Sequence, residues 1–135
     1  MSAPTAVKST RQVVEEAYGA MNTGNGEAFA ALLADDVVVM ECDHHPCPGT
    51  WSNKAELLDA FPTLAASLGL RAVHIRALIV DGDRAAAEIA IECTSKSGKE
   101  YSVDACETWK VRDGLVVAIR PYYWDVTALA ETAAS

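Results

Sequence analysis

Two glutamates occupy strand-like segments whose other inward-facing residues are apolar. Because successive strand residues point to opposite faces, Glu107 shares a face with Val103 and Trp109, and Glu41 shares one with Val37. Burial of a carboxylate disfavours its charged form, and a second carboxylate nearby raises one of the two pKa values further. One acid would then keep its proton near neutral pH while the other acts as a base. That pairing suits proton transfer beside a carbonyl group.

A structural reading of the same two residues stays open at this point. Glu107 could be paired with a cation at a strand end, or reach solvent past Trp109, and Glu41 could be exposed. Both faces of the β-branched run from Val37 to Met40 are apolar, so the face on which Glu41 lies is less sharply defined than that of Glu107.

Aromatic and histidine side chains are the candidates for binding a substrate beside these acids. If a cavity is open, flat apolar rings predict a flat, apolar or polycyclic ligand, whereas ordinary core packing is the alternative for about half of them. The candidates are Tyr18, Phe61, Tyr101, Trp109, Tyr123 and His44.

The segment from Cys42 to Cys47 holds five potential metal ligands in six residues. Its spacing matches no standard zinc finger, and no second ligand cluster exists elsewhere, so no metal is expected. The segment is interpreted as a loop at the pocket mouth, where His44 or His45 contacts ligand or solvent. His74 is expected on the outer face of its strand, and the four cysteines are expected to be reduced thiols.

Helices are predicted in the first half of the chain, where apolar residues recur at helical spacing. Ser9 and Gln12 have capping-box spacing and open a helix of about three turns. A short helix follows, with Phe29, Leu32 and Leu33 on its buried side. A strand then runs from Val37 to about Asp43. A third helix is predicted from Lys54 to Leu68, kinked or broken at Pro62.

The second half alternates with the period of strands. Strands are predicted at 72–80, 84–94, 100–112 and 115–124, joined by tight turns into an antiparallel meander. A closing helical turn is expected at 125–131. Helices followed by a meander indicate an α+β class and one domain over residues 1–135, with flexible ends at 1–8 and 132–135.

Charge and hydropathy exclude several classes of function. The net charge of −8 disfavours nucleic acid and anionic lipid as partners. No apolar run approaches the roughly 20 residues that span a bilayer, and the first ten residues lack the apolar stretch of a signal peptide. The expected location is therefore cytoplasmic, without membrane association.

Five segments, in this order and spacing, resemble the NTF2-like superfamily, in particular its SnoaL-like and ketosteroid isomerase-like branch. They are Tyr18–Gly24, Leu33–Val38, Val80–Ala85, Trp109–Gly114 and Ile119–Asp125. The resemblance implies an NTF2-like (cystatin-like) cone, in which three N-terminal helices pack on a strongly curved, mostly antiparallel sheet around one apolar pocket. It also implies a homodimer formed through the outer sheet face.

The ketosteroid isomerase-like pattern can be carried over residue by residue. The family's catalytic base falls on Glu41 and its protonated oxyanion donor on Glu107, each one methylene longer than the family's aspartate. The family's oxyanion tyrosine falls on Ala17, next to Tyr18, so the pattern itself provides no tyrosine donor.

The function implied is a cofactor-independent enzyme that moves a proton on an apolar, carbonyl-bearing small molecule, as an isomerase or a SnoaL-like polyketide cyclase (a lyase). Because the fold hosts many activities, three alternatives remain. One is a non-catalytic small-molecule-binding protein, and another is a structural association domain whose pocket is filled by side chains. The third is a dehydratase or an epoxide hydrolase; of the hydrolase pattern, Arg120 and Asp125 remain but the neighbouring Arg-x-Asp does not.

Overall fold

Helix α1 (Thr10–Thr23) begins at the capping box that the sequence predicts. The hydroxyl of Ser9 accepts from the backbone N–H of Gln12, and the side chain of Gln12 accepts from the backbone N–H of Ser9. The helix ends at Gly24, which adopts the left-handed conformation. The protein is described by a computed structural model, in which residues 6–135 are placed. The first five of the residues expected to be flexible lie outside the described part.

The next segments connect α1 to the sheet. Helix α2 (Gly26–Ala31) leads into strand β1 (Leu33–Glu41), which begins four residues earlier than predicted because Leu33 already pairs with Val116. Strand β2 (Gly49–Trp51) was not predicted. It follows the expected loop and is too short for an alternating pattern to be visible, yet it pairs antiparallel with the end of β1.

Helix α3 (Lys54–Leu68) has the bounds that the sequence predicts, but it is not broken at Pro62. A proline removes only one helical hydrogen bond, and Pro62 lies on the exposed side of the helix while Leu57, Leu64 and Leu68 are buried. The predicted break is therefore wrong. The helix ends at Gly69, whose φ of 66° and close approach to the Thr94 carbonyl leave no room for a side chain.

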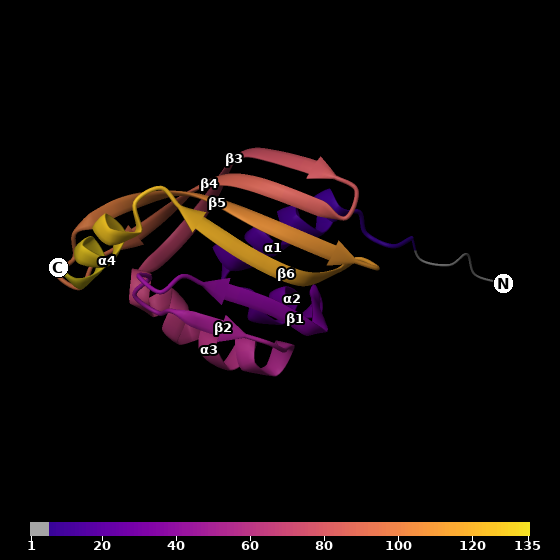
Figure 1. Ribbon diagram of the computed structural model, residues 1–135, viewed down its shortest axis with the longest axis horizontal. Helices are drawn as coiled ribbons and strands as arrows, with labels where there is room; N and C mark the ends of the chain where they lie inside the picture. Colours follow the sequence, from indigo (N-terminus) through magenta and orange to yellow (C-terminus); the bar gives the residue numbers. More distant parts are fainter. Residues whose placement is uncertain (1–5) are drawn as a thin grey trace.

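The meander is as predicted and forms most of a six-stranded sheet, in the order β2-β1-β6-β5-β4-β3. All neighbouring strands in this described sheet are antiparallel except the β1–β6 pair. The pairing between neighbouring strands shifts register at four places, and such irregularities increase the bending and twist of a sheet. The curved sheet wraps around α1, α2 and α3, which lie together on one of its faces (Figure 1). The meander strands are β3 (Leu70–Asp81), β4 (Arg84–Thr94), β5 (Glu100–Arg112) and β6 (Leu115–Tyr123).

The C-terminal end forms a fourth helix, α4 (Val126–Ala134), where the sequence predicts one turn and then a flexible tail. Asp125 caps the helix by accepting from the backbone N–H of Ala128. Leu129 and Ala133 lie one turn apart and are both buried. This packing holds the last residues in a helix, which corrects the expectation of a free tail from residue 132.

The predicted inward faces of β1 and β5 are confirmed. Val37, Val39 and Glu41 are buried while Met40 is exposed, and Val103 and Trp109 are buried on β5. The core lies between these faces and the three helices.

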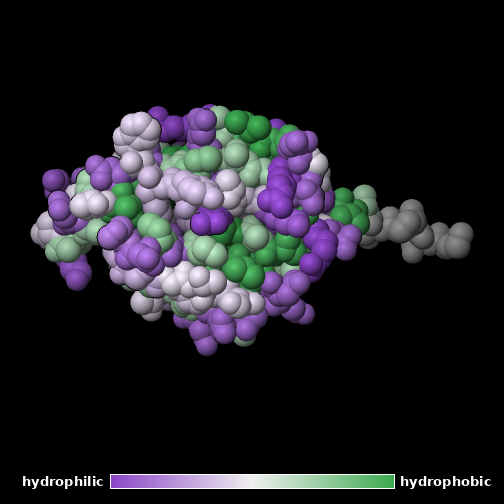
Figure 2. Space-filling model, viewed as in Figure 1, coloured by the Kyte–Doolittle hydropathy of each residue, from purple (hydrophilic) through white to green (hydrophobic). Residues whose placement is uncertain are grey.

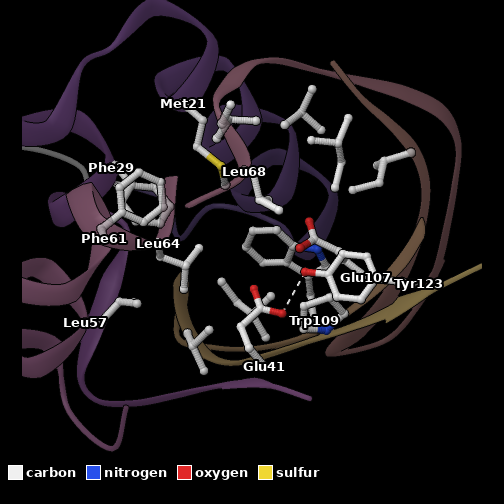
Figure 3. Close-up of a pocket in the computed structure, with 17 residues that line it drawn as sticks. Met21, Phe29, Glu41, Leu57, Phe61, Leu64, Leu68, Glu107, Trp109 and Tyr123 are labelled. Atoms are coloured by element: carbon white, nitrogen blue, oxygen red, sulfur yellow. Dashed lines mark hydrogen bonds between the residues drawn. The ribbon is translucent and has the colours of Figure 1, made fainter. Parts of the chain in front are cut away.

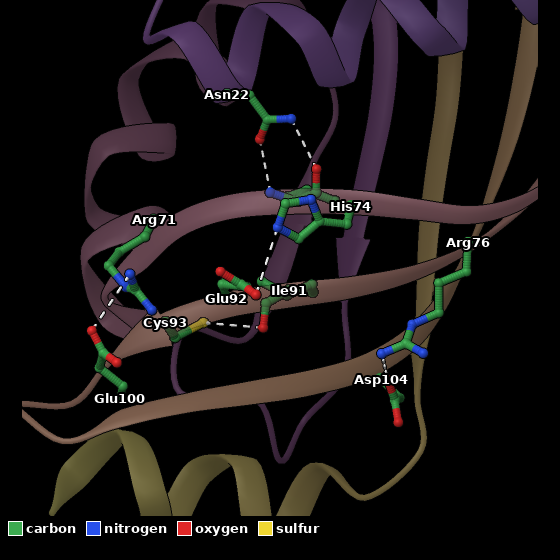
Figure 4. A network of polar contacts seen from close by, with 10 residues as sticks. Asn22, Arg71, His74, Arg76, Ile91, Glu92, Cys93, Glu100 and Asp104 are labelled. Atoms are coloured by element: carbon green, nitrogen blue, oxygen red, sulfur yellow. Dashed lines mark hydrogen bonds and ion pairs between the residues drawn. The ribbon is translucent and has the colours of Figure 1, made fainter.

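The outer face of the sheet carries charged pairs at its β3 edge. His74 points outward, as predicted, and faces Glu92, while Arg76 faces Asp104 (Figure 4). Asn22 of α1 holds β3 from the inner side, where its side chain bonds both the N–H and the C=O of Val73.

Farther along this outer face, large apolar side chains are exposed, among them Ile79, Tyr122 and Trp124. Figure 2 shows apolar side chains gathered over this face and bordered by hydrophilic ones. Among the described residues, no helix is long and apolar enough to cross a membrane.

Candidate active site

One cavity of about 70 Å³ lies between α3 and the inner face of the sheet. Helix α3 supplies one wall with Leu57, Phe61, Leu64 and Leu68, and the strands supply the opposite wall mainly with valine and isoleucine. Two carboxylic acids, Glu41 and Glu107, line this otherwise apolar space, and both are drawn in Figure 3. The predicted convergence of two acids on one cavity is therefore present in the geometry.

Glu107 lies in the middle of β5, opposite Ala87 on β4 and Pro121 on β6. Part of its surface is accessible because it faces the cavity, although protein surrounds its carboxyl group. Burial raises the pKa of Glu107, and the hydrogen bond from Tyr18 offsets part of this rise. Glu107 is thus placed to hold its proton.

Tyr18 is the hydroxyl partner of Glu107. Its OH donates to Oε1 of Glu107 at 2.5 Å and accepts from Nε1–H of Trp109 at 3.1 Å. The two aromatic rings meet edge to face, with centroids 5.2 Å apart. The family pattern placed the tyrosine at Ala17 and gave no donor. In the structure, Tyr18 reaches Glu107 because it lies one helical turn beyond Val14 on the same buried stripe. Tyr18 was predicted to bind substrate, but it does not line the cavity and contacts it only through Glu107.

Glu41 is the last residue of β1 and is only 7 % exposed. The hydroxyl of Tyr123 donates to its Oε1 at 2.7 Å (Figure 3). Burial raises the pKa of Glu41 to about 7; the Tyr123 bond opposes the rise and the nearby Glu107 adds to it. A carboxyl group with this pKa exchanges its proton readily at neutral pH.

The loop after β1 brings a histidine to Glu41, and it is His45, not His44. The backbone N–H of His45 bonds the carbonyl of Cys42, and this turn leaves His44 exposed and His45 only 3 % exposed. Nε2 of His45 lies 3.8 Å from Oε2 of Glu41, and its ring packs against that of Tyr123. The prediction of His44 as a pocket residue is wrong. A turn of this kind leaves no periodic signal from which to choose between neighbouring histidines.

The other predicted pocket residues divide into two groups. Phe61, Trp109 and Tyr123 line the cavity, as predicted. Tyr101 does not: its hydroxyl donates to the carbonyl of Leu68, and the side chain closes the core below α3 instead. The β-strand parity of Tyr101 was right, but parity gives no position along the strand relative to the cavity.

Several cavity residues were not singled out from the sequence as pocket candidates, among them the helical residues Met21 and Phe29. Both belong to helical stripes that the sequence does show, so helix periodicity indicates their burial, but it does not distinguish a cavity wall from solid core.

The described residues contain no group of three or more His, Cys, Asp or Glu side chains that could hold a metal ion. The four cysteines are free thiols, and Cys42 is exposed while Cys93 is buried. Cys93 faces Tyr101 across the β4–β5 ladder, and Cys106 faces Glu88, so these two cysteines are not opposite each other.

Comparison with known proteins places this geometry in a family. The family model described as a SnoaL-like domain matches residues 14–119. Among solved structures, an NTF2-like protein of unknown function from Burkholderia pseudomallei K96243 superposes with a TM-score of 0.83 at 20% identity, covering 93% of this chain and 98% of that one.

Two further neighbours were crystallised with small molecules. TerC, co-crystallised with polyporic acid, has a TM-score of 0.79 at 20% identity over 92% of this chain and 97% of that one. A hypothetical protein with a ketosteroid isomerase-like fold from Catenulispora acidiphila DSM 44928, in complex with trimethylamine, has a TM-score of 0.75 at 17% identity over 92% of this chain and 94% of that one. At these identities the likeness concerns the fold. No curated protein matches the sequence.

Proposed function

The chain belongs to the SnoaL-like domain family, and from that premise we propose that it is an enzyme that transfers a proton beside a carbonyl group of an apolar small molecule. Glu41 is the base, and Glu107 donates a hydrogen bond to the oxyanion that develops on the carbonyl oxygen. The single observation that carries the proposal is the convergence of two buried acids, each with a tyrosine partner, on one apolar cavity.

The division of labour follows from the different surroundings of the two acids. Glu41, at a strand end, has a pKa of about 7, so a substantial fraction is ionised and able to accept a proton at neutral pH. Glu107 lies deeper, in mid-strand, and burial dominates its raised pKa. A protonated carboxyl group in an apolar site is a strong donor toward a developing negative charge.

The chemistry needs only proton movement. The carboxylate of Glu41 removes a proton from the carbon next to the carbonyl, and the electron pair of the broken C–H bond shifts to the carbonyl oxygen, where Glu107 donates a hydrogen bond. In an isomerase, Glu41 then gives a proton to a more distant carbon of the dienolate, and exchange of the carboxyl proton with water before this step brings solvent hydrogen into the product. In a cyclase, the enolate carbon instead forms a bond to a second carbonyl of the same molecule, and that oxygen takes the proton. Neither the isomerisation nor the cyclisation requires an electron carrier or a group carrier.

Tyr18 and Tyr123 act through the two acids. Tyr18 keeps Oε1 of Glu107 occupied as an acceptor, so the proton of Glu107 is directed from the other oxygen toward the cavity. Tyr123 holds Oε1 of Glu41, so Oε2 is the oxygen left to take the substrate proton. Burial raises the pKa of both tyrosines far above neutrality, so they stay protonated donors.

The cavity restricts the substrate. Its volume of about 70 Å³ holds only a few water molecules, whereas ligand pockets usually measure roughly 300 Å³ or more. A single-ring ketone or enone therefore fits this closed form best, and a larger substrate must displace the α3 side chains Phe61 and Leu64.

A second candidate function is binding of a small organic amine without chemical change. The cavity walls carry two acids and the rings of Phe61, Trp109 and Tyr123 but no lysine or arginine. An ionised Glu41 would therefore have no cationic side chain in the cavity wall to pair with. A carboxylate flanked by aromatic faces attracts an alkylammonium group. The trimethylamine complex of the Catenulispora protein supports this alternative.

One small probe tests the first proposal. Cyclohex-3-en-1-one should isomerise to its conjugated isomer, which is followed by ultraviolet absorbance, and solvent deuterium should enter the ketone. Glu41→Gln should abolish turnover, and Glu107→Gln should retain part of it because an amide still donates. Glu92→Gln, on the outer face, is the matched control. Turnover by Glu41→Gln equal to that of the wild type would contradict the mechanism. Calorimetric binding of trimethylammonium without deuterium exchange would favour the amine-binding alternative.

A further inference from the structure

His45 contains a buried polar atom that the mechanism above does not use. Among residues 6–135, its Nε2 is the one fully buried side-chain nitrogen or oxygen without a hydrogen-bond partner. The side chain is inaccessible to solvent, so bulk water does not supply the missing hydrogen-bond partner. A buried polar group without a partner is unfavourable, and its persistence calls for a partner in some other state of the site.

The tautomer of His45 follows from its other nitrogen. Nδ1 accepts the backbone N–H of Cys47 at 2.9 Å, so it carries the lone pair and not the proton. A neutral imidazole with an acceptor at Nδ1 carries its proton at Nε2. The unpartnered Nε2 is therefore an N–H donor, and it lies 3.8 Å from Oε2 of Glu41, just beyond hydrogen-bond distance.

We propose that His45 is a positioning residue for Glu41. Its fixed Nε2–H donates a hydrogen bond to Oε2 of Glu41 when the carboxyl group of Glu41 is ionised. Tyr123 already holds the other oxygen at 2.7 Å, so the two donors would clamp the carboxylate from both sides. A small rotation of the Glu41 side chain closes the remaining gap.

The donor distinguishes the two protonation states of Glu41. An ionised Oε2 accepts from Nε2–H with one lone pair and keeps the other for the substrate proton, whereas a neutral, protonated carboxyl group is a weaker acceptor for the same donor. His45 therefore stabilises the base form and opposes the effect of burial. Glu107 has one hydroxyl donor, from Tyr18, and no equivalent second donor among the bonds of the described residues. This difference assigns the base role to Glu41 rather than to Glu107.

The groups that face this pair come from several elements. Glu41 lies on β1, Tyr123 on β6 and Glu107 on β5, and the loop contributes Cys42 and Cys47. Helix α3 contributes only apolar side chains to the cavity wall. Burial lowers the pKa of His45, which keeps the ring neutral in the range where Glu41 titrates.

A matched pair of variants separates the donor from the structural role of the ring. His45→Asn places an amide oxygen near Nδ1 and can keep the Cys47 bond, but it has no group at Nε2. His45→Gln places an amide N–H near Nε2 but loses the Nδ1 acceptor. The measurement is the pKa of Glu41 from the ¹³C resonance of its labelled carboxyl carbon, read in the folded protein without substrate.

His45→Asn should raise the pKa of Glu41 by roughly half to one unit, and His45→Gln should leave it within about 0.3 units. The opposite order, or no shift in either variant, would overturn the proposal and leave His45 a loop anchor. In the wild type, ¹⁵N spectra should show a protonated Nε2, and the chemical shift of its proton should change as Glu41 ionises. A proton on Nδ1, or an Nε2–H insensitive to Glu41, would also overturn it, even if neither variant folds.

The role as a positioning residue rests on the proposed function, but these titrations do not require activity. If the wild type isomerises the enone, His45→Asn should shift the acidic limb of its kcat/KM profile upward by the same amount. If no ketone is turned over while the titrations behave as expected, the proposed function fails and the Glu41–His45 pairing stands.

Discussion

The hydroxyl of Tyr18 donates to Oε1 of Glu107 across 2.5 Å, joining helix α1 to the middle of strand β5. The hydroxyl oxygen of Tyr18 accepts from Nε1–H of Trp109, so this phenol links Glu107 and Trp109 beside the cavity. An acid buried among apolar groups gains an ordered donor in this way, and its free oxygen is left facing the cavity. The arrangement makes Tyr18 both a structural and a positioning residue.

Tyr18→Phe should therefore lower stability and slow turnover. The free energy of unfolding should fall by about 1–3 kcal/mol, because the Nε1–H of Trp109 is left buried without an acceptor. The kcat for the enone should fall roughly tenfold, less than on loss of a direct oxyanion donor. Tyr101→Phe is the control, since Tyr101 does not line the cavity and its hydroxyl bonds the backbone carbonyl of Leu68. Equal kcat values for the two variants would contradict the role of Tyr18.

The pH dependence of stability should carry a signature of Glu41. Its pKa is about 7 when folded against an ordinary 4.5, so the folded protein binds more protons between these values. The contribution of Glu41 to the free energy of unfolding is full below about pH 4.5 and is lost as pH rises through about 7, a change of about 3 kcal/mol. The lowered pKa of His45 acts in the opposite direction.

Urea unfolding of the wild type and Glu41→Gln from pH 4.5 to 8 isolates this effect, because His45 is common to both proteins. The wild type should lose stability relative to the variant as pH rises. If the stability of the wild type relative to the variant stays constant with pH, Glu41 titrates like an exposed acid. If that relative stability rises with pH, the pKa of Glu41 is lowered in the folded protein, and either result contradicts the prediction.

Gly69 should be intolerant of any side chain. A Cβ there would lie 1.7 Å from the Thr94 carbonyl oxygen, and the residue has a φ of 66°. Gly69→Ala should lower the free energy of unfolding by about 3 kcal/mol or more. Gly24→Ala is a matched control with the same φ and open space around it, and it should cost only about 1 kcal/mol. Similar losses would mean that the turn relaxes easily.

Enlarging the cavity should favour ligands. Leu64→Ala removes a buried wall residue of α3 and should lower stability by about 2–4 kcal/mol while tightening the binding of an apolar probe such as cyclohexanone. Leu129→Ala, at a buried position of α4 that does not line the cavity, should lose comparable stability without a gain in affinity. Calorimetric titration compares the two, and an equal affinity in both variants would contradict the link between cavity size and binding.

Periodicity is the reason why so much of the fold is visible in the sequence. The capping box at Ser9 and the alternation through β4 and β5 gave correct bounds for long elements. Short or irregular stretches were not predicted: β2 is three residues long, and the first residues of β1 show no alternation of apolar and polar residues. Their pairing depends on partners far along the chain, which local patterns do not contain.

The candidate site was predictable where it lies on a strand and not where it lies on a turn. Parity alone turned Glu107 inward, because a strand has only two faces, and it turned Glu41 inward on the condition that the Val37 face is the inner one. The choice between His44 and His45 depends on one hydrogen bond to Cys42, and the exclusion of Tyr101 depends on how far α3 reaches along the sheet. Such distances arise only when the elements pack.

The central claim is that two acids share this cavity and that one of them keeps its proton at neutral pH. The most direct test is a ¹³C titration of the carboxyl carbons in glutamate-labelled protein, assigned with Glu41→Gln and Glu107→Gln. Glu107 should stay protonated at pH 7 while Glu41 titrates near pH 7. Two ordinary titrations, both near pH 4.5, would contradict the account.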